Sequence, residues 1–485
     1  MDAATPFVRP DLAPALPEIL LLAAACAVLV VDVFFGERRR HLTYLLSLAS
    51  VVGTFLAVLG MADETGVTTF GGMYVFDTFA LTLKLVVLAT VALVLVYTRG
   101  YLAARGLDRG EFYLLTLFST LGMLIIISGN HFMVVYLGLE LMSLCLYALV
   151  AMNRDSAASA EAAMKYFVLG AIASGLLLYG MSILYGLTGT LMIPEVATAV
   201  EGLGAANLGL VLALVFIVSG ITFKLGAVPF HMWLPDVYEG ANTAVTLLVG
   251  SAPKVAAFAL LYRMVSEGLA ALYMDWRDML IVLAVLSLAI GSLVAIVQTN
   301  IKRLFAYSTI SHIGFLLLGV IAGTGEGYAA AMFYAIAYVI MVLAAFGILL
   351  LLSRRGFDAV EVADLGGLNE RNPWYAFIML LVMISMAGVP VTIGFWAKLE
   401  VLAAIVQQDL VWLATLAVLF AVISAYYYLR VIWVMYFQGP ATQAAFEAPA
   451  DMRLVLSLNG AAILVLGVMP GGLLAACQAA FQSLA

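Results

Sequence analysis

Long apolar stretches follow one another along almost the whole chain, and they limit what it can fold into. A helix needs about 20 mostly apolar residues to cross a bilayer. Fourteen stretches meet this requirement, near residues 14–35, 41–62, 75–97, 112–129, 131–152, 161–187, 206–225, 241–265, 278–298, 302–322, 327–352, 373–403, 409–437 and 454–476. The sequence therefore predicts an all-α polytopic membrane protein with about fourteen transmembrane helices.

Composition excludes the soluble alternative. Of 485 residues, 65% are hydrophobic and 11% are charged, whereas soluble domains are about 45–50% apolar and about 25% charged. The net charge of −7 is spread along the chain, which does not favour nucleic acid as a partner. The three cysteines lie in apolar runs without CxxC spacing, so neither a disulfide framework nor a metal or iron–sulfur site is expected. The acidic N-terminal segment lacks the basic region of a secretory signal, and we expect the first helix to be retained.

Basic residues indicate the orientation, because cytoplasmic loops of membrane proteins are enriched in lysine and arginine. With the N-terminus outside, the cytoplasmic connections carry Arg38, Arg39, Arg40, Arg99, Arg105, Arg109, Arg154, Lys302, Arg303, Arg354, Arg355, Arg371, Arg430 and Arg453. The opposite face carries Arg9, Arg263 and Arg277. We therefore expect a protein of the bacterial plasma (inner) membrane with both termini in the periplasm.

Two of the apolar stretches are interrupted. The seventh runs into GITFKLGAVPFHMWLPDVYEGA (220–241), where Gly226, Pro229 and Pro235 break a helix beside charged residues. The twelfth contains MAGVPVTIGFWAKLEVL, in which Gly388 and Pro390 precede a lysine. Paired interrupted helices in two halves of a membrane protein are typical of an inverted repeat around a midplane ion site.

The two breaks lie five spans apart, which predicts two inverted five-helix repeats made of spans 4–8 and 9–13. An odd number of spans in each unit forces the copies into opposite topology. The predicted domains are the N-terminal helices 1–3 (1–110), the first repeat (111–267), the second repeat (268–437) and the C-terminal helix 14 (438–485).

Lysine and arginine are distributed differently along the chain. Of the six lysines, only Lys302 is predicted to lie in a loop, and five fall in apolar sequence: Lys84, Lys165, Lys224, Lys254 and Lys398. Arginines occupy loops and helix ends. A lysine in a low-dielectric site can release its proton, whereas arginine stays charged. The pattern indicates a proton relay, although Lys84 could instead extend its amine to the membrane surface.

Other titratable groups extend this pattern. Glu140 is the only acid predicted to lie well inside its span, and a charge there needs a partner, for which a lysine is the natural choice. Spacing does not say which lysine. His231 and His312 are possible relay groups because histidine titrates near neutral pH, or they are structural. The tyrosines at 426–428 fit an interface belt or helix packing.

No sequence motif for a cofactor is present. The chain contains no phosphate-binding glycine loop, no GxGxxG after a strand, no HExxH and no CxxC. We therefore expect no cofactor and no metal in this chain. An ion gradient or a partner has to drive any proton movement.

Several motifs together resemble a known family. These motifs are similar to those of the antiporter-like subunits of respiratory NADH:quinone oxidoreductase, complex I. In the first half of the chain they are GLELMSLCLYAL, FKLGAVPFHMWLPDVYEGA and SAPKVAAFALLYR, and in the second half they are QTNIKRLFAYSTISHIGF and AGVPVTIGFWAKLEVL. The likeness covers roughly residues 75–440. VYEGA and the Pro253–Lys254 pair resemble one branch of this family more than its sisters.

The resemblance implies roles for particular residues. Glu140 and Lys224 would form the charge pair of a first half-channel, Lys254 would be the central relay lysine, Lys398 would lead to the exit side, and Lys165 would modulate the pair. The pattern known to us gives no role to Lys84.

The resemblance also implies an enzyme complex. This chain would translocate protons without a redox centre, while partner subunits bind NADH, FMN, iron–sulfur clusters and quinone. Its partners would be the other membrane subunits of complex I, the peripheral NADH-oxidising arm and the lipid bilayer. Two alternatives remain open: a subunit of a multi-subunit cation/proton antiporter or membrane-bound hydrogenase, and a membrane scaffold whose buried charges only hold helices together.

Overall fold

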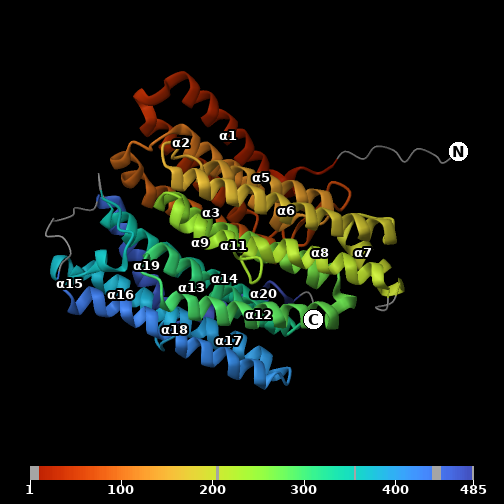
Figure 1. The fold of residues 1–485 in the computed structure, drawn as a ribbon. Helices are drawn as coiled ribbons and strands as arrows, with labels where there is room; N and C mark the ends of the chain where they lie inside the picture. The colour runs from red at the N-terminus through yellow and green to blue at the C-terminus, as the bar shows by residue number, and fades with distance from the viewer. Residues whose placement is uncertain (1–9, 204–206, 354–356, 440–448, 483–485) are drawn as a thin grey trace.

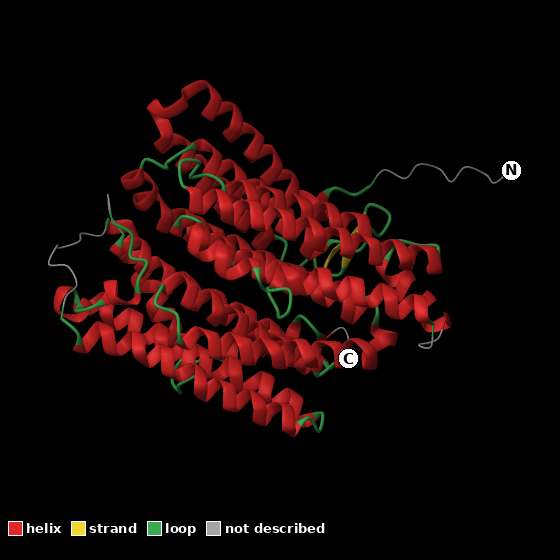
Figure 2. Cartoon of the chain, viewed as in Figure 1, coloured by secondary structure: helices red, strands yellow, loops and turns green. Residues whose placement is uncertain are grey.

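The computed structural model describes residues 10–203, 207–353, 357–439 and 449–482, and this part of the chain is almost entirely α-helical (Figures 1 and 2). Of the basic residues used for the predicted orientation, Arg9, Arg354 and Arg355 lie outside the described residues, as do both ends of the chain, and the side chain of Arg38 is not described either.

The helices form a series of packed, mostly long elements. They are α1 Leu16–Phe35, α2 Arg40–Gly60, α3 Thr78–Arg105, α4 Gly110–Ser128, α5 Phe132–Val150, α6 Ala157–Thr188, α7 Ile193–Leu203, α8 Leu208–Leu225, α9 Trp233–Gly240, α10 Thr243–Gly250, α11 Ala252–Leu261, α12 Tyr273–Ile296, α13 Ile301–Ile321, α14 Gly325–Leu352, α15 Leu368–Arg371, α16 Pro373–Ala387, α17 Ile393–Gln407, α18 Val411–Phe437, α19 Ala450–Val468 and α20 Gly471–Ala479. Two short antiparallel strands, β1 Val67–Thr69 and β2 Tyr74–Phe76, pair with Val67 opposite Phe76. A π-helical segment, Tyr262–Glu267, continues α11.

Within the described residues, thirteen helices are long and apolar enough to cross a membrane. The predicted twelfth span, 373–403, consists of two 15-residue helices, α16 and α17, so the break expected there is present. The predicted eighth span, 241–265, is also interrupted, because α10 ends at Gly250 and α11 begins at Ala252. This third break was not predicted from the sequence.

Side chains with short polar groups begin many of these helices by accepting a hydrogen bond from a backbone N–H of the first turn. The capping residues are Asp77, Ser156, Asn207, Asn242, Asn300, Thr324 and Asn372. Such caps satisfy backbone donors that have no partner inside the helix. Local sequence therefore fixes where these seven helices begin.

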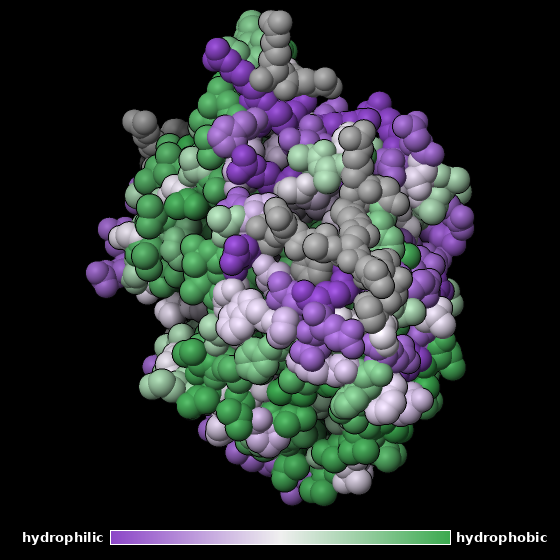
Figure 3. Space-filling view, turned by 90° about the vertical axis from the view of Figure 1, so that its left-hand side faces the viewer, coloured by the Kyte–Doolittle hydropathy of each residue, from purple (hydrophilic) through white to green (hydrophobic). Residues whose placement is uncertain are grey.

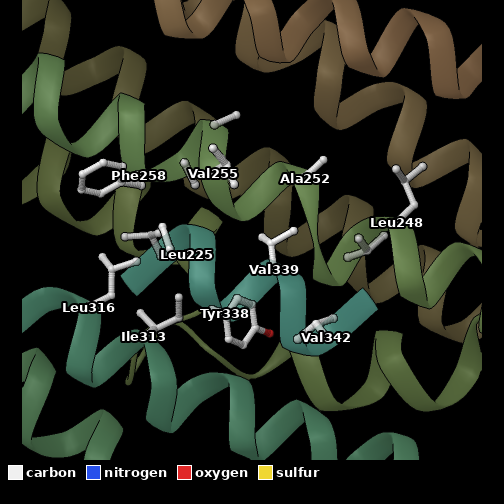
Figure 4. Packing of buried hydrophobic residues seen from close by; sticks show 14 of the residues in the cluster. Leu225, Leu248, Ala252, Val255, Phe258, Ile313, Leu316, Tyr338, Val339 and Val342 are labelled. Atoms are coloured by element: carbon white, nitrogen blue, oxygen red, sulfur yellow. The ribbon is translucent and has the colours of Figure 1, made fainter. Parts of the chain in front are cut away.

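The middle of the molecule is formed by α10 and α11 together with α13 and α14, which are buried along nearly their whole length. Figure 4 shows Val255 and Phe258 of α11, Ile313 of α13 and Val339 of α14, which belong to one cluster of buried hydrophobic side chains. In contrast, α1, α18 and α19 bury only one face. A helix that is apolar all round and buried all round belongs at the centre of a bundle.

Hydrophilic residues gather at one end of the molecule. Figure 3 faces the end at the left of Figure 1 and shows these residues spread over it, with hydrophobic residues extending over the sides. The short helix α15, which carries Arg371, lies at this end. This distribution fits helices that cross a bilayer and carry polar connections at its surface.

The order of elements from α4 to α11 is repeated from α12 to α18. In each set the first two helices pack along each other (α4 on α5, α12 on α13), and the third packs against the broken helix (α6 on α8 and α9, α14 on α16 and α17). This arrangement agrees with the predicted five-helix units. The exact domain boundaries stay a prediction.

Candidate functional site

The first helix break lies between α8 and α9. Gly226 ends α8 with φ 90° and ψ 31°, a left-handed conformation that favours glycine. The backbone N–H groups of Gly226 and Ala227 both donate to the carbonyl of Thr222, each at 2.9 Å. A side chain at position 226 would place its Cβ 2.5 Å from Leu234 Cδ1. The break therefore requires glycine for both its conformation and its packing.

The second break, between α16 and α17, repeats this geometry closely. Gly388 has φ 90° and ψ 34°, and Gly388 and Val389 donate to the carbonyl of Ile384 at 3.1 and 3.0 Å. Two segments that lie far apart in the sequence thus adopt the same helix ending. This match supports the internal repeat expected from the paired interruptions.

A lysine ammonium lies at the end of each broken helix. Lys254 of α11 donates through Nζ to the carbonyl of Leu225 at 2.8 Å and to that of Lys224 at 3.4 Å. Lys398 of α17 donates to the carbonyls of Met386 and Ala387, both at 2.9 Å. A cation is favourable there because the C-terminal end of a helix carries partial negative charge.

The lysines are not related in the way the paired interruptions predicted. From those interruptions we expected residues 387–403, with Lys398, to be the inverted counterpart of the segment that contains Lys224. The helix breaks correspond, but Lys398 occupies the capping position that Lys254 holds in the first half. Lys224 precedes its glycine by two residues, and the equivalent residue in the second half is Met386. The physical reason is that a lysine can reach the same helix end from a different helix.

Lys224 faces α5. Its Nζ donates to Ser143 Oγ at 2.9 Å and to Tyr147 OH at 3.2 Å. Glu140, Ser143 and Tyr147 share one face of α5, because residues three, four and seven apart lie above one another on a helix. Glu140 Oε1 is buried with no hydrogen-bond partner among the described residues, and no ion pair there joins it to Lys224. The two groups approach the same surface without touching.

An aromatic series connects the surroundings of Lys224 and Lys254. The Tyr147 ring lies 4.5 Å from Tyr166, which stacks on Trp233 at 4.4 Å and 9°. Lys254 Nζ lies 4.9 Å from the centroid of Trp233. Cation–π contact and the two carbonyls hold the Lys254 ammonium, so this buried charge is stabilised without a carboxylate.

His312 lies at the centre of a hydroxyl cluster in the second half. Its Nδ1 is 2.7 Å from Tyr334 OH and its Nε2 is 3.1 Å from Tyr428 OH. Tyr428 OH is also 2.5 Å from Ser308 Oγ. Each of these groups can both donate and accept, so the cluster can pass a proton along hydrogen bonds.

Lys398 lies beside this cluster. Its Nζ is 5.0 Å from the ring centroid of Phe315, which lies three residues after His312 on α13. The second possible relay histidine, His231, lies apart from it in the connection between α8 and α9. Its Nδ1 is buried with no partner among the described residues.

Lys165 and Lys302 differ from the expectation. Lys165 is 42% exposed and binds Glu161 and Asp236, each at 2.8 Å, so it is not a buried lysine. Lys302, predicted to lie in a loop, is buried in the first turn of α13 and donates to the carbonyl of Ala241 at 2.8 Å. Asn300 begins α13 before the lysine, which places the amine between helix ends. Apolar periodicity does not distinguish such positions.

Lys84 is also corrected, because it does not extend to the surface. It has no exposed surface, and its Nζ lies 2.6 Å from Glu18 Oε1 and 2.6 Å from Tyr74 OH. Glu18 lies in the first turn of α1 and is itself buried. Glu18 is thus a second acid of the predicted spans that is buried beside a lysine, although it lies near the start of its span. The pairing joins residues distant in the chain, so no local signal reveals it.

Sequence reasoning missed several members of the site. In the sequence, the signal for Ser143 and Tyr147 is their spacing of three and seven residues after Glu140, which puts polar groups on one face of the helix. Tyr428 was considered a belt or packing residue; it is buried, as is Tyr427, while Tyr426 is 58% exposed. Among the described residues, no group of three or more His, Cys, Asp and Glu side chains could hold a metal ion.

Comparison with known proteins decides the family. Residues 129–424 match the family model described as NADH:quinone oxidoreductase/Mrp antiporter, transmembrane. NADH-quinone oxidoreductase subunit N of Thioalkalivibrio sulfidiphilus is 53% identical over 477 residues, covering 98% of this chain and 99% of that protein. The chain belongs to the subunit N family of complex I. It is thus a membrane subunit of the NADH-quinone oxidoreductase enzyme.

Solved structures agree with this family. A chain of respiratory complex I from Thermus thermophilus is 30% identical, with a TM-score of 0.82 over 96% of this chain and 99% of that chain. A chain of the Mrp complex from Dietzia sp. is 20% identical, with a TM-score of 0.83 over 98% and 97%; at this identity it shows the shared fold alone. Because the chain belongs to the subunit N family, the alternative of a subunit of a cation/proton antiporter is set aside.

Proposed function

We propose that this chain conducts protons across the bacterial plasma membrane through a relay of Glu140, Lys224, Lys254 and Lys398, with His312 between the last two. The observation that carries the proposal is the placement of Lys254 and Lys398. Each ammonium lies at a matching helix break, held by backbone carbonyls and not by a carboxylate. A lysine that only anchored helices would need no such repetition.

Each relay position has a distinct chemical role. Glu140 is acid and base for Lys224 through the polar face of α5, since Ser143 and Tyr147 contact the amine. Lys254 carries the proton past the first break. Hydroxyl and imidazole groups around His312 continue the route toward Lys398. Arginine would not serve at these positions because it does not release its proton.

Lys165 and His231 have supporting roles in this proposal. Asp236 binds both Lys165, at 2.8 Å, and Arg303, at 3.0 Å. This ion-pair network links α6 and α9 of the first half to α13 of the second. Lys165 thereby modulates the Glu140–Lys224 pair through α9, and His231, in the same connection, is a second titratable group near the break.

The driving reaction lies in partner subunits. The relative of Thioalkalivibrio sulfidiphilus is named a subunit of NADH-quinone oxidoreductase. In our proposal, NADH, FMN, iron–sulfur clusters and quinone bind to other subunits of the complex. This chain assembles with the other membrane subunits and with the peripheral NADH-oxidising arm, and protons move here when quinone is reduced there.

The test replaces the relay lysines in the intact complex. We expect Lys224→Ala and Lys254→Ala to lower proton pumping and NADH:quinone reduction by about tenfold or more, since a proton-transfer group contributes roughly 10²–10⁴-fold. Lys224→Arg should be similarly impaired although it keeps the charge. Activity and pumping are measured in membrane vesicles with matched amounts of assembled enzyme.

The control is the double variant Glu18→Gln/Lys84→Met, which also removes a buried lysine but lies away from both breaks. It should retain pumping. Normal pumping in an assembled Lys224→Ala/Lys254→Ala enzyme would refute the relay and favour the scaffold reading. Full activity of Lys224→Arg would show that release of a proton from this residue is not required.

A further inference from the structure

A groove between α4 and α5 combines unpaired positive charge with an apolar floor. Its cavity has a volume of about 250 Å³ and is lined by Arg109, Arg154, Leu115, Ala148 and Met152, with Glu111 also lining it. Arg109 precedes the first residue of α4, and Arg154 follows the end of α5 by four residues. The two arginines therefore lie at the same end of this helix pair.

Neither arginine has a protein partner in the described part of the chain. Other arginines at the same end are paired: Arg40 with Asp32 at 2.6 Å, and Arg105 with Asp358 at 2.5 Å. Arg109 and Arg154 form no ion pair with a described carboxylate. Counted with Glu111, the groove keeps a net charge of one positive unit.

The apolar residues extend from the arginines toward the membrane interior. Leu115 lies in the second turn of α4 and Ala148 in the last turn of α5. An anion held between the guanidinium groups would lie at the helix ends, and a hydrocarbon chain attached to it would run over these side chains. This combination fits a phospholipid better than a small free anion, which would leave the apolar floor uncovered.

We propose that this groove binds an anionic phospholipid, with its phosphate between Arg109 and Arg154 and an acyl chain over Leu115 and Ala148. Arginine binds phosphate through two parallel N–H donors. Basic pockets between transmembrane helices at the cytoplasmic surface attract anionic headgroups, and the arginines lie at the end with the excess of basic residues. Glu111 excludes a second phosphate from that side of the groove.

Photo-labelling of the intact complex tests this site. The purified complex is placed in phosphatidylcholine nanodiscs that contain a trace of photoactivatable phosphatidylglycerol, and labelled peptides are identified by mass spectrometry. We expect labelling on the peptides that contain Leu115 and Ala148. Excess phosphatidylglycerol should abolish it, whereas phosphatidylethanolamine and inorganic phosphate should not.

Variants separate the charge from the apolar floor. Arg109→Gln/Arg154→Gln should reduce labelling about tenfold, and Ala148→Trp, which fills the groove and keeps both charges, should reduce it as well. Arg277→Gln is the control, because that arginine pairs with its neighbour Asp278. Should the glutamine variant fail to assemble, Ala148→Trp still decides the question.

Three results would overturn the proposal. The first is labelling that is absent in the unaltered complex, as expected if a neighbouring subunit covers the groove. The second is equal labelling in the unaltered complex and both variants. The third is competition by phosphatidylethanolamine or by inorganic phosphate as strong as that by phosphatidylglycerol, which would make the site a zwitterionic-lipid or simple anion site.

Discussion

Lys84 of α3 has no exposed surface, and its ammonium group contacts Glu18 of α1 and Tyr74 of β2. Tyr74 OH in turn donates to Glu18 Oε2 at 2.8 Å. The positive charge of Lys84 is thus matched by the negative charge of Glu18. The stability of the folded subunit depends on keeping both charges together. At the residue scale, the consequence is an asymmetry between removing one partner and removing both.

We expect Lys84→Met alone to destabilise the folded subunit by about 3–5 kcal/mol, because a buried carboxylate is left without its partner. The double variant Glu18→Gln/Lys84→Met should recover most of this loss, since no charge remains buried. The amount of assembled complex and its thermal inactivation measure the effect. Equal destabilisation by the single and the double variant would contradict this account.

At the scale of the elements, the two helix breaks depend on their glycines. Gly226 and Gly388 adopt left-handed conformations, and a Cβ at Gly388 would lie 2.8 Å from Lys398 Cδ. Glycine therefore permits both the helix ending and the close approach of a lysine. A side chain there would push the capping ammonium away from the carbonyls.

Gly226→Ala and Gly388→Ala should each cost about 1–2 kcal/mol for the left-handed backbone alone and reduce proton pumping more than assembly. The loss should be larger at 226, because the contact there is with the packed Leu234 side chain and not with a flexible lysine. Gly175→Ala in α6 is the matched control, since open space surrounds that position. Pumping is measured at equal amounts of enzyme. Unchanged pumping in both break variants would show that proton transport does not depend on these glycines.

At the scale of the whole molecule, orientation is set by the distribution of basic residues at the helix ends. Helices joined by short connections must alternate in direction, so one loop on a known side fixes the rest. The loop after α2 contains the exposed Glu64, and the loop after α5 contains the exposed Asp155. These two loops are predicted to lie on opposite sides of the membrane.

In a variant without Cys26, Cys145 and Cys477, we expect Glu64→Cys to react with a membrane-impermeant maleimide in intact cells. Asp155→Cys should react only after the membrane is opened. Both positions are exposed, so the difference reports sidedness and not burial. The reverse pattern would invert the orientation and exchange the uptake and release sides of the proposed relay.

The membrane class, the order of spans and both glycine breaks could be read from the sequence, because they depend on apolar length and on backbone rules that act within about twenty residues. The location of Lys224, Lys254 and Lys398 in apolar sequence was visible in the same way. The partner of each group could not be. Glu18 pairs with Lys84, Tyr428 with His312, and Lys302 with the carbonyl of Ala241, all across long chain distances.

What the sequence by itself determined is the pair of helix breaks and the lysines beside them, since glycine, proline and apolar runs act locally. What only the tertiary structure decided is which amine reaches which break. Lys254 enters from α11 and Lys398 from within the same broken helix, yet both end on the last carbonyls before a left-handed glycine. The reason is that helix packing, and not chain order, brings an ammonium group to a helix end.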